Sequence, residues 1–306
     1  MNNKIRKLLS AATLILLVAL AVYYLKNNIS DFKQLTIANP SLILVLIALF
    51  LFGYYLISII TKNLLYPLGV YLKTIEAFQL SVVTGFYNLI TPFRGGMAAR
   101  AVYLKRKYKF PYTDFLASLS ASYVLIFLVA SLLGLASAIW LFLENGVMNW
   151  ILLSVFAVVF AGMFGIVLLS PKFKERKSKW LNRFIKVING WHLIKNNKRV
   201  IFLTSIVTLV QILLSTLMLY LQFLTFGIEI SFASALFLSA IGSLSLLVAI
   251  TPGNLGVGEA ITVFSALAIG ITPAQSLSAA LLGRAVSMAV LFVLGPIFSY
   301  ALMKKK

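Results

Sequence analysis

Five polar side chains in an otherwise apolar chain are the strongest candidates for binding chemistry. They belong to Arg94, Arg100, Asn254, Glu259 and Arg284. Guanidinium groups form paired hydrogen bonds with phosphate oxygens, so the arginines suit an anionic ligand. Glu259 and Arg284 could instead form a purely structural ion pair, and the other two arginines could lie at a cytoplasmic rim. Because an ionisable group inside a membrane is costly, each charged residue is a functional candidate.

Proline and glycine gather beside these side chains in two places. The first cluster is Pro92, Gly95 and Gly96, and the second is Pro252, Gly253, Gly256 and Gly258. Proline ends a helix, and glycine permits a tight turn or the close approach of two helices. We therefore expect a hairpin tip at each cluster. A simple kink or packing motif is the alternative.

Other kinds of chemistry lack the residues they need. The chain has no cysteine and one histidine, which excludes thiolate metal sites and histidine clusters. We find no nucleotide-binding loop and no catalytic triad, so we expect no enzyme activity, no cofactor and no metal. A net charge of +20 would suggest nucleic acid in a soluble protein. Here we assign the charge to the rim of a membrane protein and expect no nucleic-acid partner.

Composition indicates which elements position the candidates. Of the 306 residues, 61% are hydrophobic and 11% are charged, and the mean hydropathy is +1.00. Soluble domains are about half apolar and about a quarter charged. Apolar runs near the ~20 residues of a spanning helix recur, so we expect an all-α polytopic membrane protein forming one transmembrane domain over 1–306.

Six runs are predicted to span the membrane. They are Leu8–Leu25, Ser41–Ile60, Phe115–Leu143, Asn149–Ser170, Ile201–Phe226 and Gln275–Met303. The first could instead be a cleaved signal peptide, since basic residues precede it and Ala19-Leu20-Ala21 resembles a cleavage site. Thr74–Leu104 and Phe232–Ile271 are apolar but ambiguous.

Arginine and lysine decide the ambiguous regions. Segments 4–7, 62–73, 94–109, 172–199 and 304–306 hold 24 of the 27 basic residues. All five segments face the cytoplasm if each ambiguous region enters the membrane and returns on the same side, as the positive-inside rule favours. We therefore predict two re-entrant helical hairpins, cytoplasmic N and C termini, and a location in the cell membrane.

The two hairpins share sequence in corresponding places. Ile90-Thr91-Pro92 matches Ile250-Thr251-Pro252, and Gly96 matches Gly256 at the same offset of 160. Each half has the order span, span, hairpin, span, in opposite orientations. We predict an inverted-topology repeat of residues 1–145 and 146–306, an architecture common among transporters. The basic loop 171–199 contains apolar residues at helical spacing, which predicts an interfacial amphipathic helix.

The hairpin segments resemble the transmembrane region of lysylphosphatidylglycerol synthases, a flippase-like family. The likeness rests on 92–100, on 252–259, and on Thr272-Pro273-Ala274-Gln275 followed by 279–284. The family commonly has glutamate where Met97 stands, an acidic–arginine pair where Ser122-Tyr123 stands, and arginine at the place of Gly258. The chain ends at Lys306, so no soluble aminoacyl-transferase domain is expected, and the resemblance implies translocation of a lipid or lipid-linked glycan.

The leading functional expectation is movement of an anionic phospholipid or lipid-linked sugar phosphate between leaflets. The hairpin tips would hold the head group, and membrane lipids would be the partners. One alternative is a non-catalytic membrane partner of a glycosyltransferase or lipid-synthesis enzyme. Another is a small-solute or ion transporter. The substrate, the coupling ion and the oligomeric state stay open at this stage.

Overall fold

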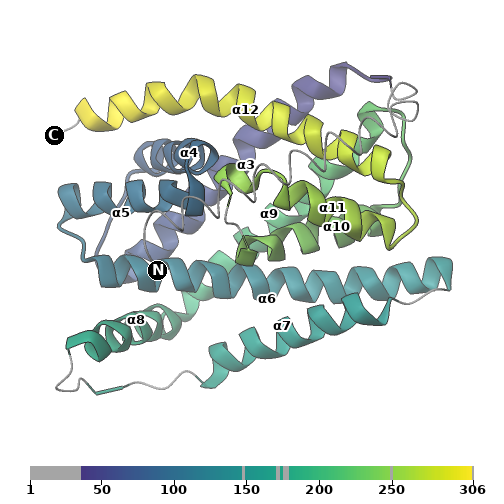
Figure 1. Ribbon diagram of the computed structural model, residues 1–306. Helices are drawn as coiled ribbons and strands as arrows, with labels where there is room; N and C mark the ends of the chain where they lie inside the picture. Colours follow the sequence, from purple (N-terminus) through teal and green to yellow (C-terminus); the bar gives the residue numbers. More distant parts are fainter. Residues whose placement is uncertain (1–35, 147–148, 170–172, 175–178, 249–250, 305–306) are drawn as a thin grey trace, which may run out of the picture.

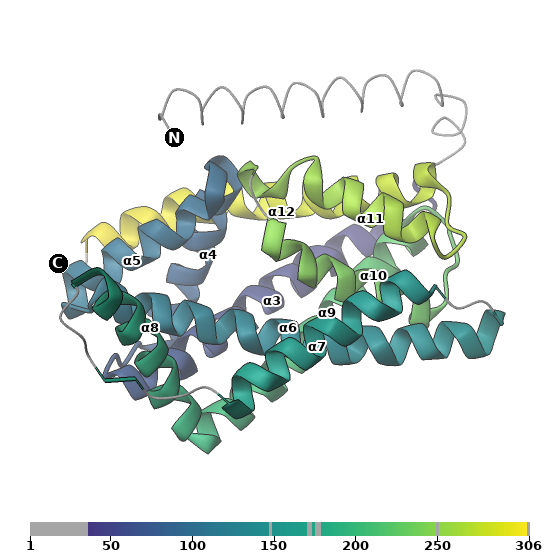
Figure 2. The ribbon, with the colours of Figure 1, turned by 60° about the horizontal axis from the view of Figure 1, so that its bottom comes forward.

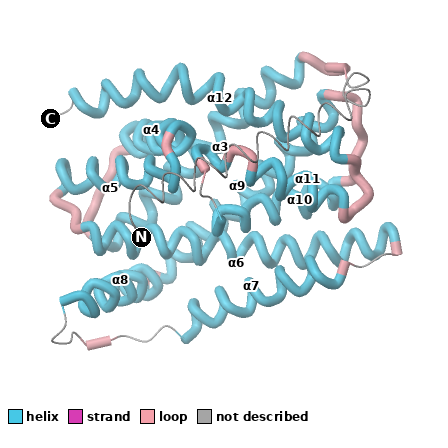
Figure 3. Tube along the Cα trace, viewed as in Figure 1, coloured by secondary structure: helices cyan, strands magenta, loops and turns pink. Residues whose placement is uncertain are grey.

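A computed structural model describes residues 36–146, 149–169, 173–174, 179–248 and 251–304. Within these residues every regular element is a helix, and no strand occurs (Figure 3). The all-α prediction is confirmed for this part of the chain. The α-helices are α3 (Ser41–Leu65), α4 (Thr74–Ile90), α5 (Gly95–Tyr108), α6 (Tyr112–Asn145), α7 (Trp150–Leu169), α8 (Lys179–Asn196), α9 (Lys198–Thr225), α10 (Phe232–Leu244), α11 (Val257–Leu267) and α12 (Pro273–Lys304). Four short 3₁₀ helices join them: η1 (Tyr66–Leu68), η2 (Pro92–Arg94), η3 (Ser245–Val248) and η4 (Pro252–Asn254).

Five helices of the described residues are long and apolar enough to cross a membrane: α3, α6, α7, α9 and α12. They coincide with five of the six predicted spans. The shortest, α7, has 20 residues, which at 1.5 Å per residue is about the thickness of a hydrocarbon core. Only 6% of its most apolar window is buried inside the protein, as suits a helix facing lipid. The sixth predicted span, Leu8–Leu25, and its signal-peptide alternative lie outside the described residues.

Both ambiguous regions are broken in two by a short 3₁₀ helix at the proline. Helix α4 has 17 residues and α5 has 14, whereas α10 has 13 and α11 has 11, so all four are shorter than the ~20 residues of a typical spanning helix. Helix α11 begins at Val257, because the Glu259 carboxylate caps its first turn, and it ends before Gly270, whose φ is +84°.

The long helices surround the two broken ones. Helices α6 and α7 lie along one side of the molecule and α12 along the other, with α3 and α9 packed together between them (Figures 1 and 2). Helix α4 packs against α12, and α10 packs against α6. The 3₁₀ helices η2 and η4 contact each other. The fold thus brings together two tips that lie 160 residues apart in the sequence.

The predicted helix of the basic loop is α8, which packs along α6. Its residues Ile185, Trp191 and Ile194 are buried, with exposed fractions of 5%, 5% and 0%. Trp191 and Ile194 join an apolar cluster with Leu125 and Val200. Part of the apolar face that was predicted to rest on lipid therefore packs against protein instead. The periodicity predicted an amphipathic helix, but it did not indicate which apolar surface would cover it.

Candidate functional site

The two tips have the same backbone conformation at matching positions. Thr91 and Thr251 are extended, a proline follows each, and the next two residues are left-handed. In the first tip these are Phe93 (φ 54°) and Arg94 (φ 56°). In the second they are Gly253 (φ 57°) and Asn254 (φ 58°). A left-handed conformation is unfavourable for phenylalanine and arginine, and such residues gather at functional sites.

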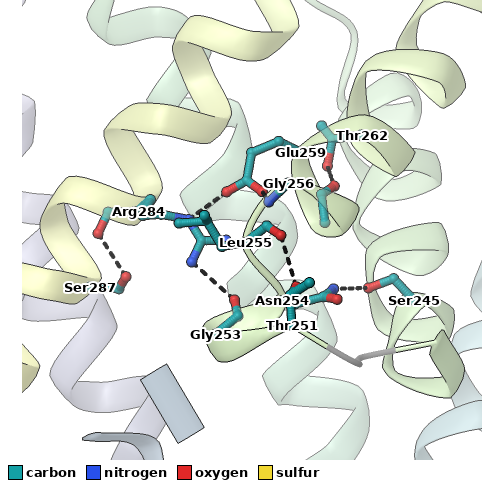
Figure 4. A network of polar contacts seen from close by, with 11 residues as sticks. Ser245, Thr251, Gly253, Asn254, Leu255, Gly256, Glu259, Thr262, Arg284 and Ser287 are labelled. Carbon is teal, nitrogen blue, oxygen red and sulfur yellow. Dashed lines mark hydrogen bonds and ion pairs between the residues drawn. The ribbon is translucent and has the colours of Figure 1, made fainter. Parts of the chain in front are cut away.

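Glu259 and Arg284 join the second tip to α12 (Figure 4). Arg284 Nε donates to Glu259 Oε1, and Arg284 Nη1 donates to the Gly253 carbonyl at 3.0 Å. Glu259 Oε2 accepts from the Gly256 amide at 2.7 Å, which caps α11. The two side chains are only 16% and 12% exposed for Arg284 and Glu259. The ion pair considered from the sequence is therefore present, and it neutralises both charges.

Asn254 lies at the end of the second tip and faces η3. Its Nδ2 donates to Ser245 Oγ at 3.3 Å, while Thr251 Oγ1 donates to the Leu255 carbonyl at 2.8 Å (Figure 4). The Oδ1 atom of Asn254 is buried without a hydrogen-bond partner among the described residues, and so is Oδ1 of Asn88 on α4. Unpaired buried acceptors are uncommon, and each requires an explanation.

The first tip has different electrostatics. Arg94 Nη1 donates to the Tyr123 hydroxyl on α6, and the guanidinium lies 5.3 Å from the centre of that ring. Arg100 donates to Thr84 Oγ1 at 3.0 Å and to Thr61 Oγ1 at 3.2 Å. In the described part of the chain neither arginine forms an ion pair with a carboxylate. Both partly buried cations are held by neutral oxygens alone.

Gly96 allows α5 to pack closely against α4. A Cβ at this position would lie 1.9 Å from the Thr84 carbonyl oxygen and 2.8 Å from the Asn88 amide nitrogen. Both atoms belong to the backbone, so they cannot move aside easily. The predicted close approach is present, and it positions Thr84 beside Arg100.

Two cavities adjoin at the tips. The larger has a volume of about 430 Å³ and is lined by Asn254, Glu259 and Arg284 among others. The smaller has a volume of about 270 Å³ and contains Arg100 in its wall. Five residues line both cavities: Tyr54, Gly85, Asn88, Arg94 and Leu246. Arg94 therefore lies at the boundary between the two spaces.

The structure places the predicted residues in different roles. All five candidate binding residues line a cavity, and Arg100 lies in a cavity wall rather than only at a rim. Among the tip residues, Gly253 and Gly258 also line the larger cavity. Pro92, Gly95, Gly96, Pro252 and Gly256 shape the turns without lining either cavity.

Several site residues were not predicted from the sequence, and they are polar groups within apolar helices: Tyr54, Thr61, Thr84, Asn88 and Gln222. Asn88 had a usable signal, because an amide one turn before a helix-ending proline is unusual in an apolar arm. Tyr123 was noted only because a charged pair stands there in similar sequences. Its pairing with Arg94 joins α6 to η2, two elements far apart in the sequence.

Comparison with known proteins gives one assignment. No curated protein matches the chain. The family model described as "Lysylphosphatidylglycerol synthase TM region" matches residues 8–295, which is most of the chain. The five long apolar helices agree with a multi-pass membrane protein. The chain therefore belongs to the family of the lysylphosphatidylglycerol synthase transmembrane region.

Proposed function

We propose that this protein moves an anionic phospholipid or a lipid-linked sugar phosphate between the two leaflets of the cell membrane. In this proposal the head group passes through the two adjoining cavities while the acyl or polyprenyl chains stay in lipid. The process is transport, with no covalent chemistry and no cofactor. The observation that supports it most strongly is the position of Arg94, which lines both cavities and lacks a carboxylate partner among the described residues.

The architecture that we propose is an inverted repeat of six spans and two re-entrant hairpins. Its support is that the packing is reciprocal between halves: the hairpin helix α4 packs against α12 of the second half, and α10 packs against α6 of the first. Helices α3 and α9, the second spans of the two halves, pack against each other. The matching left-handed tips add a local repeat of the backbone. Two similar halves of opposite orientation can exchange conformations and expose a central site alternately to each side.

The proposed orientation puts both termini in the cytoplasm. The basic C-terminal ends of α5 and α12 then lie on the cytoplasmic side, in agreement with the positive-inside rule. The chain lacks native cysteine, so single cysteines can be introduced and labelled without background. Cysteines at Lys107 and Lys195 should react only from the cytoplasmic side. Labelling of both from outside would overturn the hairpins and the repeat together.

Charge and hydrogen-bonding capacity favour an anionic head group that also carries donors. Arg94 and Arg100 can donate to phosphate, whereas Arg284 is already neutralised by Glu259. The unpaired oxygens of Asn88 and Asn254 can accept hydrogen bonds. Glycerol or sugar hydroxyls next to a phosphate would supply the missing donors.

The test is a flipping assay in proteoliposomes. A fluorescent phosphatidylglycerol is distributed over both leaflets, and an impermeant quencher reports how fast the inner label reaches the outside. We expect the folded protein to accelerate this exchange. Arg94→Gln and Arg100→Gln should each slow it at least tenfold, because a hydrogen bond to a charged group contributes about 1.5–3 kcal/mol.

Controls separate transport from loss of structure. Lys105→Gln lies on an exposed part of α5 and lines neither cavity, so it should flip at the wild-type rate. The proposal would be refuted if the folded protein moved neither labelled phosphatidylglycerol nor a labelled polyprenyl phosphate. Stable co-purification of a glycosyltransferase or lipid-modifying enzyme, with flipping absent, would favour the accessory-subunit alternative.

A further inference from the structure

A deep groove lies on the periphery of the protein, away from the two central cavities. It is formed by α4, α5 and the C-terminal end of α12, which meet at one end of the molecule (Figure 1). Its volume is about 1160 Å³, which slightly exceeds the usual range of about 300–1,000 Å³ for small-molecule sites. The proposed function does not use this groove.

The floor of the groove is apolar. It is lined by Leu80, Val83 and Leu302, whose exposed fractions are 1%, 7% and 5%. Val102 and Met303 stand at its edge and are 38% and 68% exposed. A hollow of this kind suits a hydrocarbon chain, because burying apolar surface is favourable by about 25 cal/mol per Å².

The rim of the groove is basic, with Arg106, Lys107 and Lys109 in its wall. Lys107 is already neutralised, since its Nζ lies 2.9 Å from Glu76 Oε1. Burial alone would raise the pKa of Glu76, but hydrogen bonds from Tyr108, Lys107 and Tyr103 lower it overall, which keeps the carboxylate ionised. Within the described chain Arg106 and Lys109 have no carboxylate partner, so two positive charges remain available.

Two details indicate that the groove is more than a gap between helices. Lys109 ends α5 in a left-handed conformation (φ 55°), a place where glycine or asparagine is usual, and its side chain lines the groove. The Oγ atom of Ser299, also in the wall, is buried without a hydrogen-bond partner among the described residues. A strained basic residue and a residue with an unsatisfied hydroxyl both line the same groove.

We propose that this groove is a binding site for an anionic membrane phospholipid, with an acyl chain against Leu80, Val83 and Leu302 and the head-group phosphate between Arg106 and Lys109. An apolar floor beside a cationic rim is complementary to a lipid with a negative head group. The site is separate from the translocation route, so it can exist whether or not the protein flips lipid.

The test uses a fluorophore on a single cysteine at Val102 and nitroxide-labelled lipids in nanodiscs. At equal mole fraction, nitroxide phosphatidylglycerol should quench this fluorophore more strongly than nitroxide phosphatidylcholine. Replacing Arg106 and Lys109 by glutamine should lower the preference by roughly fivefold for each side chain, because a basic residue near an anionic surface contributes about 1 kcal/mol. Lys105→Gln is the matched control on the same turn of α5, outside the groove, and should leave the preference unchanged.

A second fluorophore position reports non-specific contact with lipid. Tyr300 on α12 is 65% exposed and does not line the groove, so a cysteine there should be quenched equally by both lipids. Equal quenching by both lipids at Val102 would overturn the proposal, as would a preference that Lys105→Gln removes as well. The proposal would also be overturned if neither lipid quenched the fluorophore at Val102. In that case a cross-link from Val102 to a cysteine placed in 8–25 would identify the chain itself as the occupant of the groove.

Discussion

The ion pair between Glu259 and Arg284 allows the sharpest prediction about stability. Glu259→Gln removes one charge and leaves the Arg284 guanidinium, only 16% exposed, without a counterion. Breaking a buried pair from one side costs about 3–5 kcal/mol. Glutamine keeps a carbonyl oxygen that can still accept from the Gly256 amide, so we expect the lower value, about 3 kcal/mol.

The assay is thermal unfolding of the purified protein in nanodiscs, followed by intrinsic tyrosine and tryptophan fluorescence. A loss of 1 kcal/mol lowers the unfolding temperature of a 150–250-residue protein by about 2–4 °C. Since this chain is longer, we use about 2 °C per kcal/mol and expect Glu259→Gln to unfold about 6 °C below the wild type.

The double variant Glu259→Gln with Arg284→Gln tests the cause. Removing both charges avoids the unpaired cation, so we expect most of the stability to return. Thr262→Val is the control in the same cavity wall, because among the described residues the Thr262 hydroxyl bonds only to the Gly258 carbonyl of its own helix, at 3.0 Å. A double variant less stable than Glu259→Gln alone would refute the reasoning, and so would an unchanged unfolding temperature for Glu259→Gln.

Two further predictions concern α4 and α5. Gly96→Ala should destabilise the protein by about 1–3 kcal/mol, since its Cβ would lie 1.9 Å from the Thr84 carbonyl oxygen. Gly162→Ala on α7 is the control, because a Cβ there has nothing within 4 Å, and it should be neutral in the same unfolding measurement. Glu76→Gln should lower stability at neutral pH but not in acid. The pKa of Glu76 is held below its ordinary 4.5, so the ionised carboxylate stabilises the folded protein above that value. This stabilisation is lost as the pH falls through the lowered pKa. A difference between wild type and Glu76→Gln that persists unchanged well below pH 4 would contradict this assignment.

The spans were predictable because a bilayer sets their length. Of the described helices, α3, α6, α7, α9 and α12 each begin within a few residues of the predicted start. The length of an apolar run can be read from the sequence alone, and the thickness of the hydrocarbon core sets the length that a spanning helix needs. The breaks at Pro92 and Pro252 were predictable for a similar reason, since proline cannot continue either arm.

The conformation of the first tip was not predictable. Glycine signals a left-handed residue, but Phe93 and Arg94 adopt that conformation with no such signal. These residues lie in η2, which contacts η4, an element distant in the sequence. The partners of Arg94 and Arg100 were hidden for the same reason, because Tyr123 and Thr61 reach them from other helices.

The proposed repeat explains why the two tips differ in charge. Helix α5 follows its N-cap Arg94 with Met97 at the third position, and α11 follows its N-cap Gly256 with Glu259 at the third position. The positions of Met97 and Glu259 differ by 162, two more than the offset of 160 at the prolines, and at this larger offset Ser122 corresponds to Arg284.

Met97 and Ser122 line the smaller cavity, just as Glu259 and Arg284 line the larger one. The second half therefore has an ion pair where the first half has two neutral side chains. Without a carboxylate at the position of Met97, nothing in the described chain neutralises Arg94 and Arg100. In this view the duplicated backbone forms two similar cavities, and the neutral pair in the first half leaves positive charge available to an anionic head group.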